Sequence, residues 1–230
     1  MDCGAGMTHT IDLHWQMSNH ATLRQALPAQ ALWNSRIALP RLCAEALCPS
    51  RELLLVHGAI NQQWHKSRGF HLGDDLVRGT DRLIWIADTY LLCRNFGNKE
   101  WNALVTYCQS HDLGDVVSSA LCDAVEKAGL VLPAGLLEKL RPANGRSALF
   151  DYLRKPDGLS VLRADFAASQ GAGEKARLLK TALVPSRSQL LGRYPGAERW
   201  PTFALYLRRY GDALLKTLPL RAARAAKEQR

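Results

Sequence analysis

The chain has 230 residues, of which 47% are hydrophobic and 22% are charged, and its formal net charge is +9. This composition excludes a disordered chain and is sufficient for one sizeable domain or two small ones. The longest apolar stretches, residues 53–60 and 83–93, are shorter than the roughly 20 apolar residues that a membrane-spanning helix needs. The first ten residues lack the apolar segment of a secretory signal, so we expect a cytoplasmic protein.

Six cysteines are scattered along the chain, and no two of them form a CxxC pair. Such spacing is typical of reduced thiols packed as small hydrophobic residues, and not of a disulfide framework or a zinc site. The sequence also contains no HExxH, P-loop or dinucleotide-binding motif.

The positive charge is concentrated in the second half of the chain. Residues 1–140 carry 12 Lys and Arg against 14 Asp and Glu, whereas residues 141–230 carry 18 against 7. This asymmetry is typical of proteins that bind a polyanion, and also of helices with a solvated basic surface. Both interpretations are consistent with the sequence.

The first predicted element is a β-strand at residues 9–17. Hydrophobic residues alternate there with polar ones, which is the period of a half-buried strand. Asp12 and His14 therefore project from the same polar face. A single strand needs a partner for its backbone hydrogen bonds, and no later segment shows the alternation as clearly.

The rest of the chain is predicted to be helical, because apolar residues recur there at helical spacing. Ser50 is a candidate N-cap for the first long helix, and Gly129 is expected to end the fourth. The glycine-rich segment at residues 69–79 is expected to be an exposed loop. We expect helices at residues 50–66, 80–94, 98–108, 112–128, 146–155, 161–169, 174–183 and 198–218.

The predicted fold class is mainly α: a helical bundle preceded by one N-terminal β-strand or hairpin. We expect four segments along the chain. A β element comes first, then a helical domain, then a basic helical region that begins at a hinge near Pro142, and last a polar tail. Their predicted ranges are 1–20, 21–141, 142–220 and 221–230.

Several side chains on the predicted helices have expected structural roles. Trp85 and Trp101 fall on apolar faces and are expected in the core. Asp88 interrupts an apolar helix, so we expect it to be buried and paired with a nearby arginine. On the helix at residues 50–66, we expect His57 in the core and His65 at the surface.

Two arginines near the C-terminal end are candidate phosphate contacts. Arg187 and Arg193 could hold a nucleotide or an acceptor phosphate through their guanidinium groups, or could serve as helix caps and surface charges. In the final helix, basic residues lie opposite an apolar stripe that includes Phe203 and Leu207. We expect this stripe to dock on the core; the alternative is a basic amphipathic helix facing an acidic partner or a membrane surface.

Taken in order, five segments resemble the C-terminal part of the uncharacterised bacterial nucleotidyltransferase family of the polymerase-beta superfamily. The resemblance extends from about Thr10 to about Leu215. Its segments are IDLHW (11–15), LLLVHG (53–58), RLIWIADTYLL (82–92), EWNALVTYCQSHDLG (100–114) and PSRSQLLGRYP (185–195), followed by a closing amphipathic helix.

The resemblance implies a magnesium-dependent active site. In that superfamily three carboxylates hold two Mg²⁺ ions, and Asp12 matches the third carboxylate, so it is implied as a catalytic residue and a metal ligand. His14 shares the polar face of Asp12, so it could contact a phosphate or orient the Asp12 carboxylate; the alternative is a histidine with a supporting or surface position. The predicted strand would then be the remnant of a mixed sheet.

The residues before Asp12 depart from the family pattern. They contain neither the phosphate-binding Gly-Ser turn nor the paired carboxylates that precede the third acid. Three explanations are open: the true start lies upstream, the gene is a decayed or split copy, or a partner supplies the catalytic half. We therefore expect this chain to be inactive alone.

Two functions from different classes follow. The first is Mg²⁺-dependent transfer of a nucleotidyl group from a nucleoside triphosphate (NTP) to a hydroxyl or phosphate acceptor. The second is a non-enzymatic helical interaction module that binds a protein partner or a polyanion such as nucleic acid through residues 141–230. Neither the acceptor nor the base of the nucleotide follows from the sequence.

Overall fold

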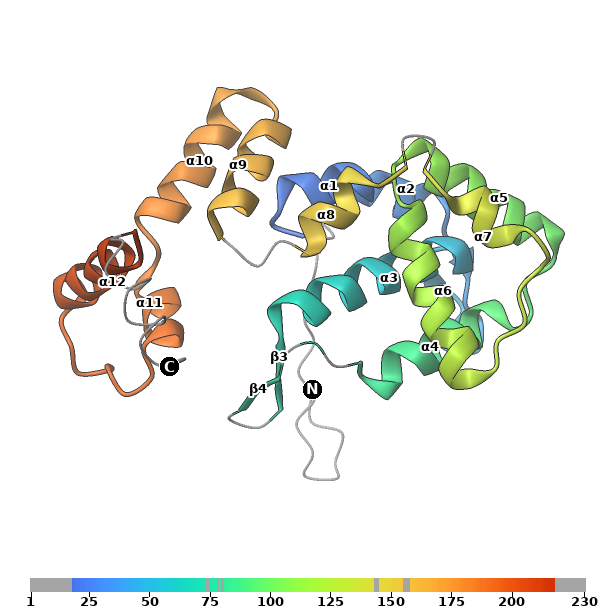
Figure 1. Cartoon of the computed structure of the whole chain (residues 1–230), viewed down its shortest axis with the longest axis horizontal. Coiled ribbons are helices and arrows are strands. Elements are labelled where there is room, and N and C mark those ends of the chain that lie inside the picture. The colour runs from blue at the N-terminus through green and yellow to red at the C-terminus, as the bar shows by residue number, and fades with distance from the viewer. Residues whose placement is uncertain are drawn as a thin grey trace, which may run out of the picture. The chain divides into compact units, whose positions relative to one another are not determined.

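A computed structural model of the chain describes residues 18–72, 75–77, 79, 81–142, 145–154 and 158–217. The strand predicted at residues 9–17, with Asp12 and His14, lies outside these residues, as does the predicted tail at 221–230. The described part is mainly helical and contains short antiparallel hairpins, one of them near the N-terminus (Figure 1). The predicted mainly α fold class is therefore confirmed.

The described chain contains short and long helices and two pairs of short strands. The helices are α1 (Ala21–Ala26), α2 (Ala29–Asn34), α3 (Arg51–Arg68), α4 (Leu83–Cys93), α5 (Asn98–Ser110), α6 (Gly114–Ala128), α7 (Leu136–Leu140), α8 (Ala148–Arg154), α9 (Gly158–Ala168), α10 (Gly171–Leu183), α11 (Arg187–Arg193) and α12 (Thr202–Thr217). The strands are β1 (Ile37–Ala38), paired with β2 (Leu47–Cys48), and β3 (Phe70–Leu72), paired with β4 (Asp75–Val77).

The chain divides into two compact units, the first ending at Ser169 and the second beginning at Gln170. This division falls after α9, whereas the sequence placed a boundary near Pro142. The reason is that α8 packs on α3 and α6, while α9 packs on α1, so both helices belong to the first unit.

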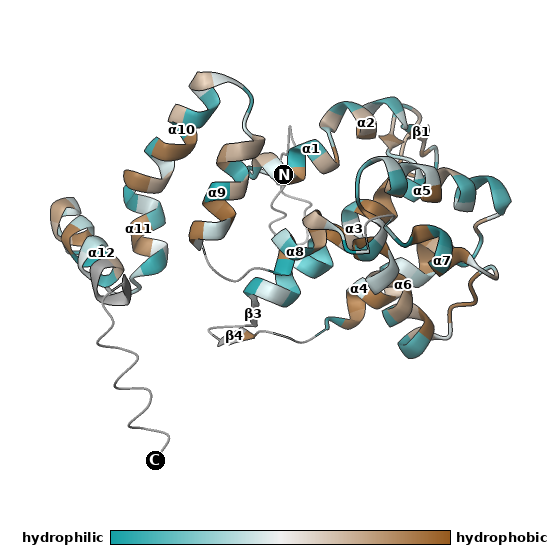
Figure 2. Ribbon diagram, turned by 45° about the horizontal axis from the view of Figure 1, so that its top comes forward, coloured by the Kyte–Doolittle hydropathy of each residue, from teal (hydrophilic) through white to brown (hydrophobic). Residues whose placement is uncertain are grey.

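The core of the first unit lies where α3, α4, α5 and α6 pack together (Figure 1). Its apolar side chains recur at helical spacing, so that each helix presents one hydrophobic face to the others. Figure 2 shows the resulting alternation of hydrophobic and hydrophilic residues along α6. The most deeply buried large side chains of this core include Leu55, Val56, Ile60, Leu104, Leu113 and Leu121.

The ends of the long helices follow the predicted signals in part. Ser50 is the N-cap residue of α3, although its side chain makes no capping hydrogen bond. Gly129 ends α6 in the left-handed conformation, with φ of 69°, where a glycine carries no Cβ penalty. At the other end of α6, Gly114 lies against the end of α7, and a Cβ atom there would meet the Leu140 carbonyl oxygen at 1.7 Å.

Several local predictions were wrong. The segment at residues 69–79 contains the hairpin β3–β4, because strand pairing satisfies backbone groups that a loop would expose to water. Asp88 is exposed, so the expected burial against a nearby arginine is not found, because this position of α4 lies at the surface. His57 is exposed and His65 is half-buried against the Trp85 ring, with 6.0 Å between ring centroids. Trp85 and Trp101 are buried, as predicted.

The second unit is built from α10, α11 and α12 around a small core. Four buried residues form it: Leu190, Tyr194, Ala197 and Leu205. The predicted docking of the apolar stripe of α12 was wrong, because Phe203 and Leu207 are 67% and 68% exposed while Leu205 is fully buried. None of the helices in the described chain has the length and hydropathy to cross a bilayer.

Candidate functional site

The structure locates two of the four predicted site residues. Asp12 and His14 lie outside the described residues, so the predicted metal ligand has no described surroundings. Among the described side chains, no group of three or more His, Cys, Asp or Glu is arranged to hold a metal ion. The described residues therefore do not by themselves fit a magnesium site.

Arg187 and Arg193 lie at opposite ends of α11 in the second unit. The Arg187 guanidinium donates hydrogen bonds to the carbonyl oxygens of Glu198 (2.8 Å) and Trp200 (2.9 Å) and to Oγ1 of Thr202 (3.0 Å). These bonds hold the turn before α12. Arg193 is exposed, and its guanidinium carbon lies 6.0 Å from the centroid of the Tyr194 ring.

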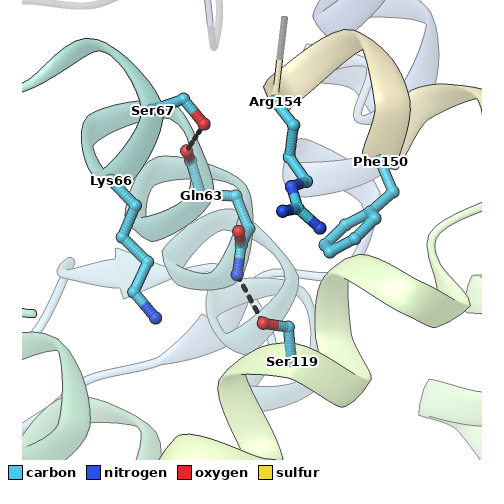
Figure 3. A pocket seen from close by; sticks show the side chains of 6 residues that line it. All are labelled: Gln63, Lys66, Ser67, Ser119, Phe150 and Arg154. Carbon is cyan, nitrogen blue, oxygen red and sulfur yellow. Dashed lines mark hydrogen bonds between the residues drawn. The ribbon is translucent and has the colours of Figure 1, made fainter. Parts of the chain in front are cut away.

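An open pocket of about 430 Å³ lies in the first unit between α3, α6 and α8. Volumes of this order are typical of small-molecule sites. Figure 3 shows the lining side chains converging from the three helices. They are Gln63, Lys66 and Ser67 from α3, Ser119 from α6, and Phe150 and Arg154 from α8.

Neutral hydrogen-bonding groups with fixed positions form one side of the pocket. The Gln63 side chain is 4% exposed, and its Nε2 donates to Oγ of Ser119 at 2.7 Å (Figure 3). The hydroxyl of Ser67 donates to the Gln63 carbonyl oxygen at 3.0 Å. The Ser67 bond is to the backbone of Gln63, so it is the bond to Ser119 that holds the Gln63 side-chain amide in one orientation. A site that selects hydrogen-bonding ligands requires such fixed groups.

The Lys66 side chain is held at the pocket by two carboxylates. Its Nζ lies 2.5 Å from Oδ1 of Asp81 and 2.6 Å from Oδ2 of Asp123. Lys127 contacts the same two carboxylates, so the positive charges of the two lysines are neutralised by the negative charges of the two aspartates. Burial opposes ionisation of Asp81, but the hydrogen bonds from Lys127 and Lys66 outweigh it and hold the pKa of Asp81 below its usual value.

Arg154 supplies the remaining positive charge of the pocket. Its guanidinium carbon lies 5.4 Å from the centroid of the Phe150 ring, within cation–π range. No carboxylate within the described part of the chain pairs with Arg154, and its side chain is exposed to solvent. Among the described residues, the pocket therefore combines one cation without a paired carboxylate, an aromatic wall and fixed neutral donors and acceptors.

A second polar cluster of the first unit surrounds Asp165, which is 1% exposed. Its carboxylate accepts hydrogen bonds from the Thr22 backbone N–H (3.1 Å) and the Tyr152 hydroxyl (3.1 and 3.2 Å), and lies 2.6 Å from Nδ1 of His20. The His20 ring packs against Trp64 at 4.4 Å. This cluster joins α1, α8 and α9.

Neither the pocket nor the Asp165 cluster was among the sequence-based candidates. Their residues come from three different helices each, and no spacing in the sequence connects Gln63 with Ser119 and Arg154, or His20 with Asp165. The only available signal was the polar character of the segment at residues 61–68, on an otherwise amphipathic helix.

No known protein family, curated protein or solved structure matches the chain. The resemblance of the sequence segments to nucleotidyltransferases therefore stays a prediction. The geometry of the pocket is independent of that resemblance and gives the site that can be tested directly.

Proposed function

We propose that this protein is nucleotidyltransferase-like and that its helical part binds the phosphates of an NTP in the pocket between α3, α6 and α8. The observation that carries the proposal is the chemistry of the pocket lining. Arg154 offers a planar guanidinium to phosphate oxygens, and Lys66 lies at the opposite side of the same space (Figure 3).

The remaining lining residues suit the uncharged parts of a nucleotide. The Phe150 ring offers an apolar face for a base or a sugar, and the Gln63 amide and the Ser119 hydroxyl offer hydrogen bonds. An open pocket of about 430 Å³ is large enough for a phosphate chain with part of a nucleoside.

The catalytic part of the proposal comes from the resemblance alone. It assigns Asp12 as a catalytic residue and a ligand of Mg²⁺, and it implies nucleotidyl transfer to a hydroxyl or phosphate acceptor. The paired carboxylates of the family pattern are not found before Asp12. The scattered cysteines favour the cytoplasm as the location.

Calorimetric titration of the full chain with ATP and GTP tests the binding site. We expect saturable binding, and we expect Arg154→Ala to weaken it at least about tenfold, since a charge-assisted contact to phosphate contributes about 1.5–3 kcal/mol. The matched control is Arg94→Ala, which removes an exposed arginine at the end of α4. Absence of saturable binding, or equal weakening by both variants, would contradict the proposal.

A transfer assay with a labelled NTP tests the catalytic part separately. In any longer form of the protein that turns over, Asp12→Asn should abolish transfer while leaving binding at the pocket intact. Unchanged turnover in that variant would refute the assignment of Asp12. The second candidate function, a helical interaction module, is supported by a different part of the molecule, the exposed apolar face of α12.

A further inference from the structure

The second unit exposes an apolar stripe along α12, which consists of Phe203, Leu207 and Tyr210. These side chains are 67%, 68% and 43% exposed. They occupy positions i, i+4 and i+7, so they form one line along the helix. Leu205 lies on the opposite side and is fully buried against α11.

Hydrogen bonds made by residues outside the stripe fix the direction in which the stripe points. The Tyr194 hydroxyl donates to Oδ2 of Asp212 at 2.9 Å, and the Tyr206 hydroxyl donates to the Pro185 carbonyl oxygen at 2.7 Å. Arg209 donates to the Ala182 carbonyl oxygen at 2.5 Å. Turning α12 to bury the stripe would break these contacts, so the exposure is built into the unit.

The stripe continues onto the end of α10. The Tyr210 hydroxyl donates to the Leu183 backbone carbonyl oxygen, so the end of α10, where Leu183 and Val184 follow one another, lies at the Tyr210 end of the stripe. Each of these two side chains is 56% exposed. Contiguous large apolar side chains of this kind mark a binding surface and are uncommon on a freely soluble monomer.

The net charge of the chain belongs to the unit that carries the stripe. Residues 170–230 contain 13 Lys and Arg against 4 Asp and Glu, whereas residues 1–169 contain 17 of each. Exposed arginines of the second unit include Arg193, Arg199 and Arg208. A second copy of the chain would bring two strongly positive units together, so charge disfavours self-association and favours an anionic surface.

We propose that the second unit binds the surface of an anionic lipid membrane, with the stripe inserted at the boundary between headgroups and acyl chains. An extended apolar line beside many basic side chains is the pattern of interfacial helices. Tyr210 at the stripe and Trp200, which is 41% exposed, are side chains that favour this boundary. Leu207 and Leu183 offer no hydrogen bonds to nucleic acid bases, so the stripe suits lipid better. The proposal does not rest on nucleotide binding.

Co-sedimentation of the full chain with vesicles tests this proposal. We expect binding to phosphatidylcholine vesicles that contain phosphatidylglycerol, and at least about tenfold weaker binding to phosphatidylcholine alone, since several basic residues of the second unit are attracted to an anionic surface and not to a neutral one. The double variant Phe203→Ser/Leu207→Ser should weaken binding to the anionic vesicles at least about tenfold, because it removes most of the apolar area of the stripe.

The matched control is Leu91→Ser/Val131→Ser, which removes two exposed apolar side chains from the first unit and should leave vesicle binding unchanged. Far-UV circular dichroism checks that both double variants are folded. Equal vesicle binding by the wild type and by the α12 double variant would show that the stripe is not the membrane-binding surface. Absence of vesicle binding overturns the proposal, and salt-sensitive binding to RNA or a dimer lost in the α12 variant would then identify the surface as a nucleic-acid site or an interface between copies.

Discussion

His20 Nδ1 lies 2.6 Å from Oδ2 of Asp165, although the two residues are 145 positions apart in the sequence. The contact joins the residue before α1 to α9, and Tyr152 brings α8 to the same carboxylate. Burial opposes ionisation of Asp165, but the hydrogen bonds from His20 and from Thr22 outweigh it and hold its pKa below the usual value. A buried carboxylate thus holds three helices together.

Removing the charge of Asp165 should destabilise the first unit. In Asp165→Asn a neutral amide replaces the carboxylate, and its own N–H donors face the Tyr152 hydroxyl and the Thr22 N–H, which are donors too. Because the site has no access to water, the surplus donors stay without an acceptor. We expect a loss of about 2–4 kcal/mol in the free energy of unfolding, measured by urea denaturation. The control Asp88→Asn, at an exposed position on α4, should stay within about 0.5 kcal/mol of wild type. Equal urea midpoints for Asp165→Asn and Asp88→Asn would show that the hydrogen bonds around Asp165 contribute nothing to the stability of the fold.

Acid should weaken the fold through the same carboxylate and through Asp81. Both have a lowered pKa in the folded state, so the folded protein binds their protons less readily than the unfolded chain. Their stabilisation is complete above the unfolded pKa of about 3.9 and is lost as the pH falls through the lower folded values. Melting temperatures measured from neutral pH down to about pH 2 should fall steeply below about pH 4. The difference between wild type and Asp165→Asn should shrink over the same range, and a constant difference would contradict this.

Helices were predictable from the sequence where one local signal sufficed. The periodicity after Ser50 and the glycine at position 129 located α3 and the end of α6, because these features depend on neighbours in the chain. The pocket and the Asp165 cluster depend on residues from three helices each, and their convergence is decided by packing. The orientation of α12 was mispredicted for a similar reason. Periodicity identifies an apolar stripe, but the bonds of Tyr206 and Arg209 decide which side of the helix meets its own unit.

Two glycine-to-alanine changes should have opposite effects. A Cβ at position 114 would lie 1.7 Å from the Leu140 carbonyl oxygen, and backbone cannot rotate aside as a side chain can. Gly114→Ala should therefore cost at least about 2 kcal/mol by pushing α7 away from α6. Gly58 lies in α3, and a Cβ there would meet nothing within 4 Å beyond its chain neighbours and the backbone of its own helix, so Gly58→Ala should stabilise the protein by about 0.5–1 kcal/mol. Urea denaturation of the two variants measures both changes in the free energy of unfolding. Equal changes, or a larger loss for Gly58→Ala than for Gly114→Ala, would contradict the close contact between α6 and α7.

Cysteine reactivity should divide into two classes in the native protein. Burial raises the pKa of Cys93 and of Cys108 to about 12, so both remain thiols at neutral pH and lie away from reagents. Cys43 and Cys122 are exposed and should react with iodoacetamide first. Peptide mapping by mass spectrometry after brief labelling should find Cys93 and Cys108 modified only when urea is present. Labelling of Cys108 at the rate of Cys122 in native buffer would contradict the burial of α5 against the core.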